Sequence, residues 1–201
     1  PERVERFFLE SIENGLEGII AKDLNAPYIA GARKFAWIKL KRSYKGELSD
    51  SVDVAIIGYF KGKGKRTQFG LGGLLTAVYD EQGDSFKSIA KIGTGMSEET
   101  LIELESKLSK IAQKQKPARV ECEIEPHEWV KPLYVIEVRA DEITRSPMHT
   151  AGKDSDGTGY ALRFPRMIKL REKKPEQSTT VAEIISMYKK QASVQLQDAG
   201  P

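Results

Sequence analysis

Short segments with the pattern of β-strands, in part with alternating hydrophobic and polar residues, recur along the chain after residue 51. Between Ala118 and Glu125 every second residue is apolar and the residues between them are charged, as in a strand with one buried face. The same reading predicts strands over 52–61, 68–80, 86–92, 118–125, 133–140 and 160–167. Such a series of short strands favours a small barrel.

One helix is predicted among these strands, beginning after Ser97. Glu98 and Glu99 would lie in its first turn, where carboxylates stabilise the helix dipole. Apolar residues at helical spacing would form its buried face, namely Leu101, Leu104, Leu108 and Ile111. Five or six strands with one helix inserted midway predict a mainly β fold with short helices (α+β). The expected form is a five- to six-stranded Greek-key barrel, and the oligonucleotide-binding (OB) fold is the obvious candidate.

The two ends of the chain have patterns of their own. Helical spacing over residues 3–14 predicts an amphipathic helix, followed by strand-like segments at Glu17–Lys22 and Phe35–Lys41. Thr180-Val-Ala-Glu183 is a capping box that begins a last helix, which we expect to end near Gln191. We therefore expect a small piece at 1–42, the barrel with its C-terminal helix at 43–192, and a flexible tail at 193–201.

The composition argues against several classes of protein. The apolar runs are a few residues long, whereas a membrane span needs about 20, and the first residues lack the layout of a signal peptide. One cysteine, Cys122, and two histidines exclude an internal disulfide and argue against a zinc enzyme. A single cysteine fits a reducing cytosol. The start at Pro1, directly before a helical pattern, leads us to expect the later part of a longer protein.

The net charge of +3 conceals a segregation of charge. Residues 32–45, 59–68 and 163–174 hold 16 of the 32 Lys and Arg but one of the 29 Asp and Glu, so they carry +15 and the other residues −12. Clustered cations indicate a polyanionic partner, because Lys and Arg that neutralise phosphates release counterions. The pattern favours nucleic acid, with nucleotide phosphate second and solvated strand faces as the alternative.

Two segments near the start could bind phosphate. The period of two in Trp37–Lys41 places Trp37, Lys39 and Lys41 on one strand face, although an exposed face with Lys stems over the Trp gives the same pattern. Glu17–Lys22 supplies a carboxylate and an ammonium group, and Glu17 could hold a divalent ion that bridges to phosphate. On a regular strand Glu17 and Lys22 would face opposite ways, so an ordinary strand with charged ends is the alternative.

Two later segments could contact nucleic acid. The glycines of Lys61–Arg66 let the backbone approach a phosphodiester, and the alternative is a solvated hairpin tip. Phe164 lies between Arg163 and Arg166, which suits an exposed platform or wedge against nucleotides. If it were buried, Phe164 would be an ordinary core residue.

Taken in order, these segments resemble the C-terminal half of an ATP-dependent DNA ligase of the archaeal and eukaryotic replicative type. Glu17–Lys22 resembles the fourth nucleotidyltransferase motif and Trp37–Lys41 the fifth. Arg163-Phe-Pro-Arg166 before Pro175-Glu-Gln-Ser-Thr-Thr180 is close to diagnostic of the family. Further matches, which extend the resemblance over nearly all of the chain, are Asp53–Gly58, Gly62–Arg66, Gly72-Gly73, Tyr79-Asp80 and Lys91–Gly95.

The resemblance implies that residues 1–42 end an adenylation (nucleotidyltransferase) domain and that the barrel is an OB domain that clamps DNA. It also implies roles for the matching residues. Glu17 would be a metal ligand. The nucleotide would be bound by Lys22, Arg33, Lys39, Lys41, Arg171 and Lys174. DNA would be bound by Lys63, Lys65, Arg66, Arg163, Phe164 and Arg166.

The sequence departs from the family pattern in two places. The sixth motif usually ends Arg-x-Asp-Lys, whereas this chain has Arg171-Glu-Lys-Lys174, so Lys173 replaces the acid. The family's nucleophile is the lysine of Lys-x-Asp-Gly, and this sequence contains no such tetrapeptide. We therefore expect a fragment that cannot ligate alone.

The resemblance implies a parent enzyme that seals nicks in duplex DNA through ligase-adenylate and DNA-adenylate intermediates, in replication, repair and recombination, with ATP and Mg²⁺. The implied partners are nicked double-stranded DNA and a sliding clamp contacted by a preceding region. We expect a monomer, cytoplasmic and nucleoid-associated in an archaeon or nuclear in a eukaryote. A stand-alone nucleic-acid-binding OB module and an RNA-capping or RNA-ligating nucleotidyltransferase are the alternatives.

Overall fold

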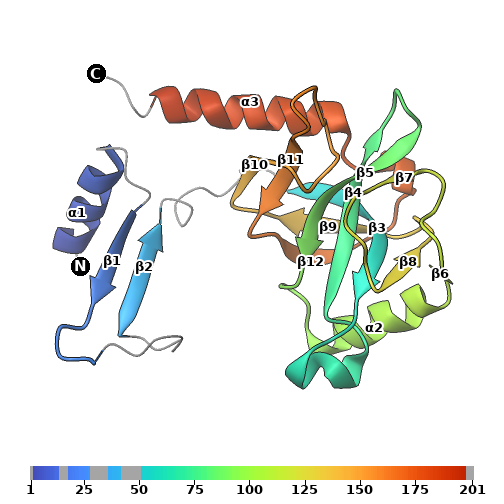
Figure 1. Cartoon of the computed structure of the whole chain (residues 1–201), viewed down its shortest axis with the longest axis horizontal. Helices are drawn as coiled ribbons and strands as arrows, with labels where there is room; N and C mark the ends of the chain where they lie inside the picture. Colours follow the sequence, from blue (N-terminus) through green and yellow to red (C-terminus); the bar gives the residue numbers. More distant parts are fainter. Residues whose placement is uncertain (1, 14–17, 28–35, 42–50, 198–201) are drawn as a thin grey trace.

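The computed structural model describes residues 2–13, 18–27, 36–41 and 51–197, so the expected domain boundary near residue 43 lies outside the described residues. The N-terminal piece contains helix α1 (Glu2–Glu13) and strands β1 (Gly18–Lys22) and β2 (Trp37–Lys41) (Figure 1). The two strands pair antiparallel, with Gly18 opposite Lys41 and Lys22 opposite Trp37. Cross-strand partners point to the same face of a ladder, so Lys22 shares a face with Trp37 and Lys39.

The larger piece is a barrel. Its strands run in the order β12-β9-β3-β4-β5, and each neighbouring pair is antiparallel. The sheet closes because the chain leaving β5 meets the start of β12: the amide of Met167 donates to the carbonyl of Thr94 at 3.0 Å, beside a parallel bridge between Thr94 and Arg166. The prediction of a mainly β, OB-type barrel is confirmed. The barrel strands are β3 (Val52–Phe60), β4 (Gly73–Asp80), β5 (Ser85–Ile92), β9 (Val135–Arg139) and β12 (Arg166–Arg171).

Shorter elements surround these five strands. Helix α2 begins where the sequence predicts, since the Ser97 side chain accepts the Thr100 amide at 3.2 Å. Its leucines at 101, 104 and 108 are buried in the core. The other elements are η2 (Gly64–Phe69), α2 (Glu98–Ser109), β6 (Ala112–Gln113), β7 (Val120–Glu121), β8 (Glu128–Val130), β10 (Glu142–Ser146), β11 (Gly159–Arg163), η3 (Pro175–Gln177) and α3 (Val181–Gln197).

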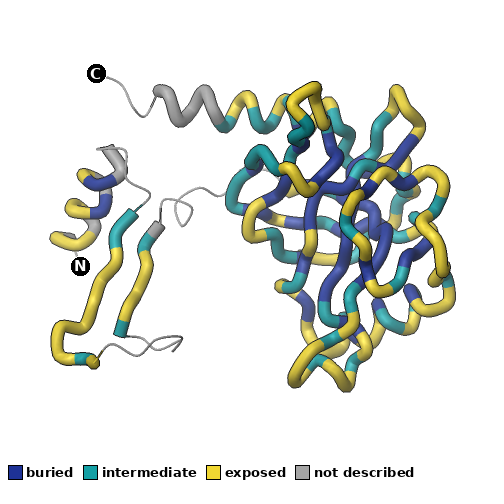
Figure 2. The backbone as a smooth tube through the Cα atoms, viewed as in Figure 1, coloured by how far each residue is buried: buried dark blue, intermediate teal, exposed yellow. Residues whose placement is uncertain are grey.

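The core lies inside the barrel and beneath α2. Side chains such as Ile56, Leu74 and Ile136 have no exposed surface, and the barrel strands are the largely buried part of the chain in Figure 2. A second buried cluster outside the first contains Phe86 and Trp129. Burial of apolar surface at roughly 25 cal/mol per Å² is the main source of stability in such a domain.

Three predicted strands differ from the structure. The segment 68–80 begins within the 3₁₀ helix η2, and β4 starts only at Gly73. The segment 118–125 keeps its alternating burial only from Val120, since Ala118 is exposed. It is a strand only at β7, because β7 pairs with no more than the first residues of β5. The segment 160–167 is divided between β11 and β12 at Phe164–Pro165, since proline has no amide proton to donate to a ladder. Helix α3 continues to Gln197, into the expected tail.

Candidate nucleic-acid interface

Phe164 lies at a break between two antiparallel ladders. Strands β9 and β12 pair on one side of it and β10 and β11 on the other. Its backbone is left-handed, with φ of 49°, and its side chain is 52% exposed. A bulky residue in this conformation is strained and persists only where its surroundings hold it. The predicted placement of Phe164 on the surface rather than in the core agrees with the structure.

The neighbours of Phe164 fix the chain on both sides. The guanidinium of Arg163 lies 5.3 Å from the centre of the Phe164 ring. The Thr94 hydroxyl donates to the carbonyl of Pro165 at 2.9 Å, and Arg166 pairs with Asp141 at 3.0 Å. Together these contacts hold the backbone of the turn that carries the exposed Phe164 ring. Sequence reasoning gave no role to Thr94, although it lies in the matching Lys91–Gly95 segment, and no local pattern pointed to Asp141.

A shallow, open hollow of about 500 Å³ adjoins this turn. Its volume lies within the range of small-ligand sites. Three of its residues come from the Phe164 turn, one from the end of β5 and three from the chain that leaves β5: Phe164, Pro165, Arg166, Lys91, Gly93, Thr94 and Gly95. The barrel therefore presents an aromatic ring, a short run of exposed backbone and several cations in one place.

The basic loop 61–66 approaches the same region. Lys63 and Lys65 are exposed, as expected of residues that would contact DNA. Arg66 instead donates from Nη1 to the carbonyl oxygens of Gly93, at 2.6 Å, and Gly72, at 3.2 Å. Arg66 therefore links the basic loop to the segment at Gly93 that lines the hollow. The sequence did not predict this structural contact.

The residues assigned to the nucleotide lie in both pieces of the chain. Lys22 places its ammonium group 4.5 Å from the Trp37 ring, and Lys39 is exposed on the same face of the β1–β2 ladder. Lys41 lies opposite Gly18 in the register, and its side chain is outside the described part of the structure. Glu17 and Arg33 also lie outside the described residues, so the metal ligand and that nucleotide contact stay predictions.

Two cations of the sixth-motif segment, Arg171 and Lys173, are paired with acids of neighbouring strands. Lys173 contacts Asp53 at 2.5 Å, and Arg171 lies 3.6 Å from Asp53 and 3.3 Å from Glu137. Lys174 is exposed, and its amide donates to the side chain of Gln177. The sequence windows rich in cations are therefore partly neutralised by acids that lie far away in the chain.

The segment 175–180 joins this motif to the barrel. The amide of Thr179 donates to the carbonyl of Asp53 at 2.9 Å, and the Asp53 amide donates to the Thr179 hydroxyl at 3.0 Å. Tyr79 donates its amide to the carbonyl of Thr179, and Arg119 pairs with Glu176 at 2.8 Å. This segment, which we call the clasp, holds β3, β4 and the end of β12 together.

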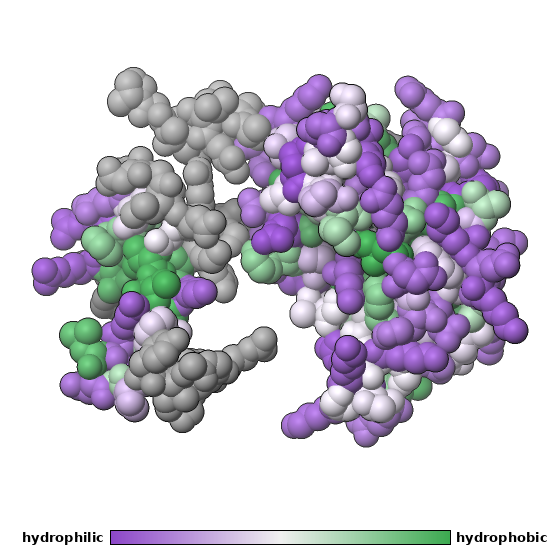
Figure 3. All heavy atoms as spheres, in the orientation of Figure 1, coloured by the Kyte–Doolittle hydropathy of each residue, from purple (hydrophilic) through white to green (hydrophobic). Residues whose placement is uncertain are grey.

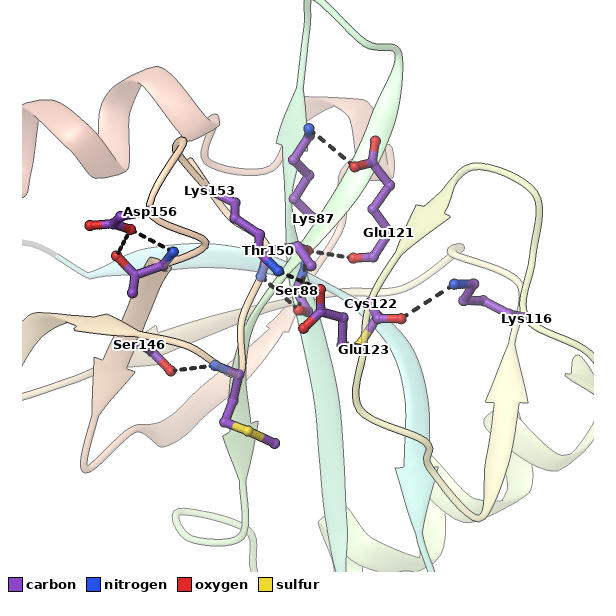
Figure 4. Close-up of polar contacts among 12 residues, drawn as sticks. Lys87, Ser88, Lys116, Glu121, Cys122, Glu123, Ser146, Thr150, Lys153 and Asp156 are labelled. Atoms are coloured by element: carbon purple, nitrogen blue, oxygen red, sulfur yellow. Dashed lines mark hydrogen bonds and ion pairs between the residues drawn. The ribbon is translucent and has the colours of Figure 1, made fainter.

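A polar cluster at the start of β5 is internally satisfied (Figure 4). Lys87 pairs with Glu121 and Asp80, at 3.2 Å each, and the Ser88 amide donates to the buried Thr150 hydroxyl. Among the described residues no group of three or more His, Cys, Asp or Glu side chains could hold a metal ion. Burial raises the pKa of the Cys122 thiol, which argues against a reactive cysteine. The cluster is structural.

The surface of the barrel is mainly hydrophilic on the face shown in Figure 3, whereas hydrophobic side chains gather over α1 and β1. Within the described ranges no helix is both long and apolar enough to cross a membrane. A polar, cation-bearing barrel with one exposed aromatic ring is suited to a hydrated, anionic partner.

A closed, mainly antiparallel barrel with one helix inserted between its strands belongs to the class of OB-type domains. Comparison with protein families gives the particular family. The model of the ATP dependent DNA ligase C terminal region matches residues 67–174, and that of the ATP dependent DNA ligase domain matches residues 1–41. The chain belongs to the ATP-dependent DNA ligase family.

Individual relatives agree with this assignment. A probable DNA ligase of Dictyoglomus turgidum is 52% identical over 200 residues, which cover 98% of this chain and 34% of that protein. A DNA ligase of Hyperthermus butylicus is 45% identical over 95% of this chain and 32% of its own length. The ligase domain of M. tuberculosis LigD is 28% identical, with a TM-score of 0.47 over 87% of this chain and 51% of that one. The chain spans about a third of the length of the curated relatives it matches.

Proposed function

We propose that this chain is the DNA-clamping and nucleotide-contacting part of an enzyme that seals nicks in duplex DNA. The observation that carries the proposal is the exposed, conformationally restrained ring of Phe164 beside Arg163. An aromatic ring fixed outside the core can be pressed between or against nucleotides without a further loss of side-chain entropy. Contacts to the backbone suit an enzyme that must accept any sequence.

The second part of the proposal concerns the nucleotide. Lys22 and Lys39 share one strand face in the N-terminal piece, and two neighbouring ammonium groups are stabilised when an anion lies between them. These residues, with Arg33, Lys41, Arg171 and Lys174, would hold the adenylate and its phosphates. Mg²⁺ held in part by Glu17 would supply positive charge where phosphoryl charge develops. The remaining catalytic groups, the nucleophilic lysine included, would come from another part of the protein.

Binding of labelled DNA by the 201-residue chain tests the first part. We expect Phe164→Ala to weaken binding to nicked duplex by about tenfold, because loss of an aromatic contact to a nucleotide costs roughly 1–3 kcal/mol. The matched control is Met148→Ala, since Met148 is 55% exposed but does not line the hollow. Equal affinity of the Phe164→Ala variant and the unchanged chain for nicked duplex would contradict the proposal.

The same assay separates the other two hypotheses. An RNA-specific nucleotidyltransferase predicts selective, tight binding of single-stranded RNA, which an OB domain of a DNA ligase does not require. A stand-alone binding module predicts no preference for a nick. In the presence of ATP and Mg²⁺ we expect this chain to form no covalent AMP adduct, because its sequence has no Lys-x-Asp-Gly. Formation of an adduct would show that adenylation uses a lysine within these residues.

The broader roles follow from the family and are proposed with it. A parent ligase would act in DNA replication, repair and recombination, and its DNA would be the 5′-phosphate and 3′-hydroxyl ends at a nick. A monomer could perform this reaction, with a sliding clamp contacted through a different region. Localisation with DNA, in the nucleoid of an archaeon or in a nucleus, would follow.

A further inference from the structure

Two cation–aromatic pairs adjoin the hollow beside Phe164. Arg163 covers the Phe164 ring, and Lys91, which lines the hollow, places Nζ 3.8 Å from the centre of the Phe60 ring. Within the described part of the chain no acidic side chain pairs with Lys91 or Arg163. These two cations therefore differ from Arg171 and Lys173, which are already paired with carboxylates.

An aromatic ring holds a cation in place without using all of its hydrogen-bond donors. A lysine ammonium group has three hydrogen-bond donors. The face of the Phe60 ring attracts the charge of Lys91 without accepting a conventional hydrogen bond, so these donors stay available to a ligand. Fixing Lys91 on the ring before a ligand arrives reduces the side-chain entropy that binding would cost. The Phe60 ring is itself fixed, because His127 packs edge-on against it with ring centres 5.8 Å apart.

The backbone between the two pairs is accessible. Gly93 lines the hollow, and outside its chain neighbours a methyl group built on it would find only the carbonyl oxygen of Gly72 within 4 Å, at 3.8 Å. The space above Gly93 is thus unfilled by the rest of the described chain. Small residues at such a position allow a sugar–phosphate backbone to approach the protein backbone closely.

We propose that the hollow is a seat for a backbone phosphate of the bound DNA, with Lys91 and Arg163 as its cations and Gly93 as its floor. The inference rests on the proposed function and adds two residues, Lys91 and Gly93, to the DNA contacts that the sequence indicated. A phosphate in this seat would place the adjoining nucleotides next to the Phe164 ring. The phosphate seat and the Phe164 ring would then contact neighbouring nucleotides of the same DNA strand.

Two substitutions test the seat in the 201-residue chain. Lys91→Met keeps an apolar side chain over Phe60 but removes the charge, so we expect affinity for nicked duplex to fall about fivefold. The dependence of log affinity on log salt concentration should become shallower by about 1, since one phosphate contact is lost. Gly93→Ala places a methyl group in the space proposed for the phosphate, so it should weaken binding to nicked duplex about as much as Lys91→Met does. It should leave the thermal unfolding temperature unchanged or slightly raised.

Lys107→Met is the matched control. Lys107 also lies over an aromatic ring, that of Tyr134, but it does not line the hollow, and its loss should leave both affinity and salt dependence unchanged. If both test variants bind nicked duplex like the unchanged chain while Phe164→Ala does not, the seat is wrong and the proposed function stands. If the unchanged chain fails to bind nicked duplex, the proposed function itself fails. A salt dependence unaltered by Lys91→Met would also overturn the seat.

Discussion

Burial of His149 should make the stability of the barrel depend on pH. Its side chain is 9% exposed, and Nδ1 has no hydrogen-bond partner within the described structure. Burial lowers the pKa of His149 from 6.5 to about 4, because an imidazolium here would lose its hydration without gaining a partner. As the pH falls, the unfolded chain therefore binds this proton before the folded chain does.

The direction and size of the effect follow by linkage. The contribution of His149 to stability is fully present above about pH 6.5 and is lost progressively as the pH falls through that range toward about 4. The full difference between the two pKa values corresponds to about 3 kcal/mol, of which about 2 kcal/mol is lost by roughly pH 5. His149→Gln cannot take up the proton. The variant should therefore lose about 2 kcal/mol less than the unchanged chain between about pH 7.5 and pH 5.

Urea unfolding at the two pH values measures this difference, followed by circular dichroism and by the fluorescence of Trp129, which is buried in the second cluster. Thr150→Val is the control. Thr150 is as buried as His149 but does not titrate, and its hydroxyl is hydrogen-bonded to Ser88 and Glu121. Its loss should cost the same free energy at both pH values. The reasoning is refuted if His149→Gln and the unchanged chain lose equal stability on acidification.

Two further substitutions test the packing and the electrostatics. Gly95→Ala should lower the free energy of unfolding by at least ~2 kcal/mol, because φ there is 85° and the added methyl would lie 2.2 Å from the carbonyl oxygen of Met167. An unchanged urea midpoint would contradict this. Asp53→Asn should free Lys173, whereas Arg171 keeps its ion pair with Glu137, so that the salt dependence of DNA binding becomes steeper by about 1. A slope equal to that of the unchanged chain would show that Lys173 stays out of reach of DNA.

Features set by neighbouring residues could be predicted from the sequence. The start of α2 needed only a serine followed by acids and spaced leucines, and the Ser97 hydroxyl does accept the Thr100 amide. The capping box of α3 is also present, since Thr180 and Glu183 exchange hydrogen bonds. Strands β3, β5 and β9 lie within two residues of the ranges predicted for them. In each case the contacts that decide the structure lie within a few residues of one another.

The parts that could not be predicted depend on contacts across the fold. The barrel closes through Thr94 and Arg166, which are 72 residues apart, and no periodicity in either segment indicates that pairing. The same holds for the acids that neutralise Arg171 and Lys173, because cross-strand partners are set by register. Counting charges along the chain therefore overestimated the free positive charge of 163–174.

The clasp explains how one departure from the family pattern is accommodated. Lys173 stands where the sixth motif usually has an acid, and in the structure its ammonium group contacts Asp53. The main chain of Asp53 is held by Thr179 through two hydrogen bonds: the Thr179 amide donates to the Asp53 carbonyl, and the Asp53 amide donates to the Thr179 hydroxyl. Because Thr179 belongs to the Pro-Glu-x-x-x-Thr run, that run fixes the main chain of the residue whose carboxylate contacts Arg171 and Lys173. Through Asp53 this run therefore helps to set where the side chains of Arg171 and Lys173, which precede it in the chain, lie.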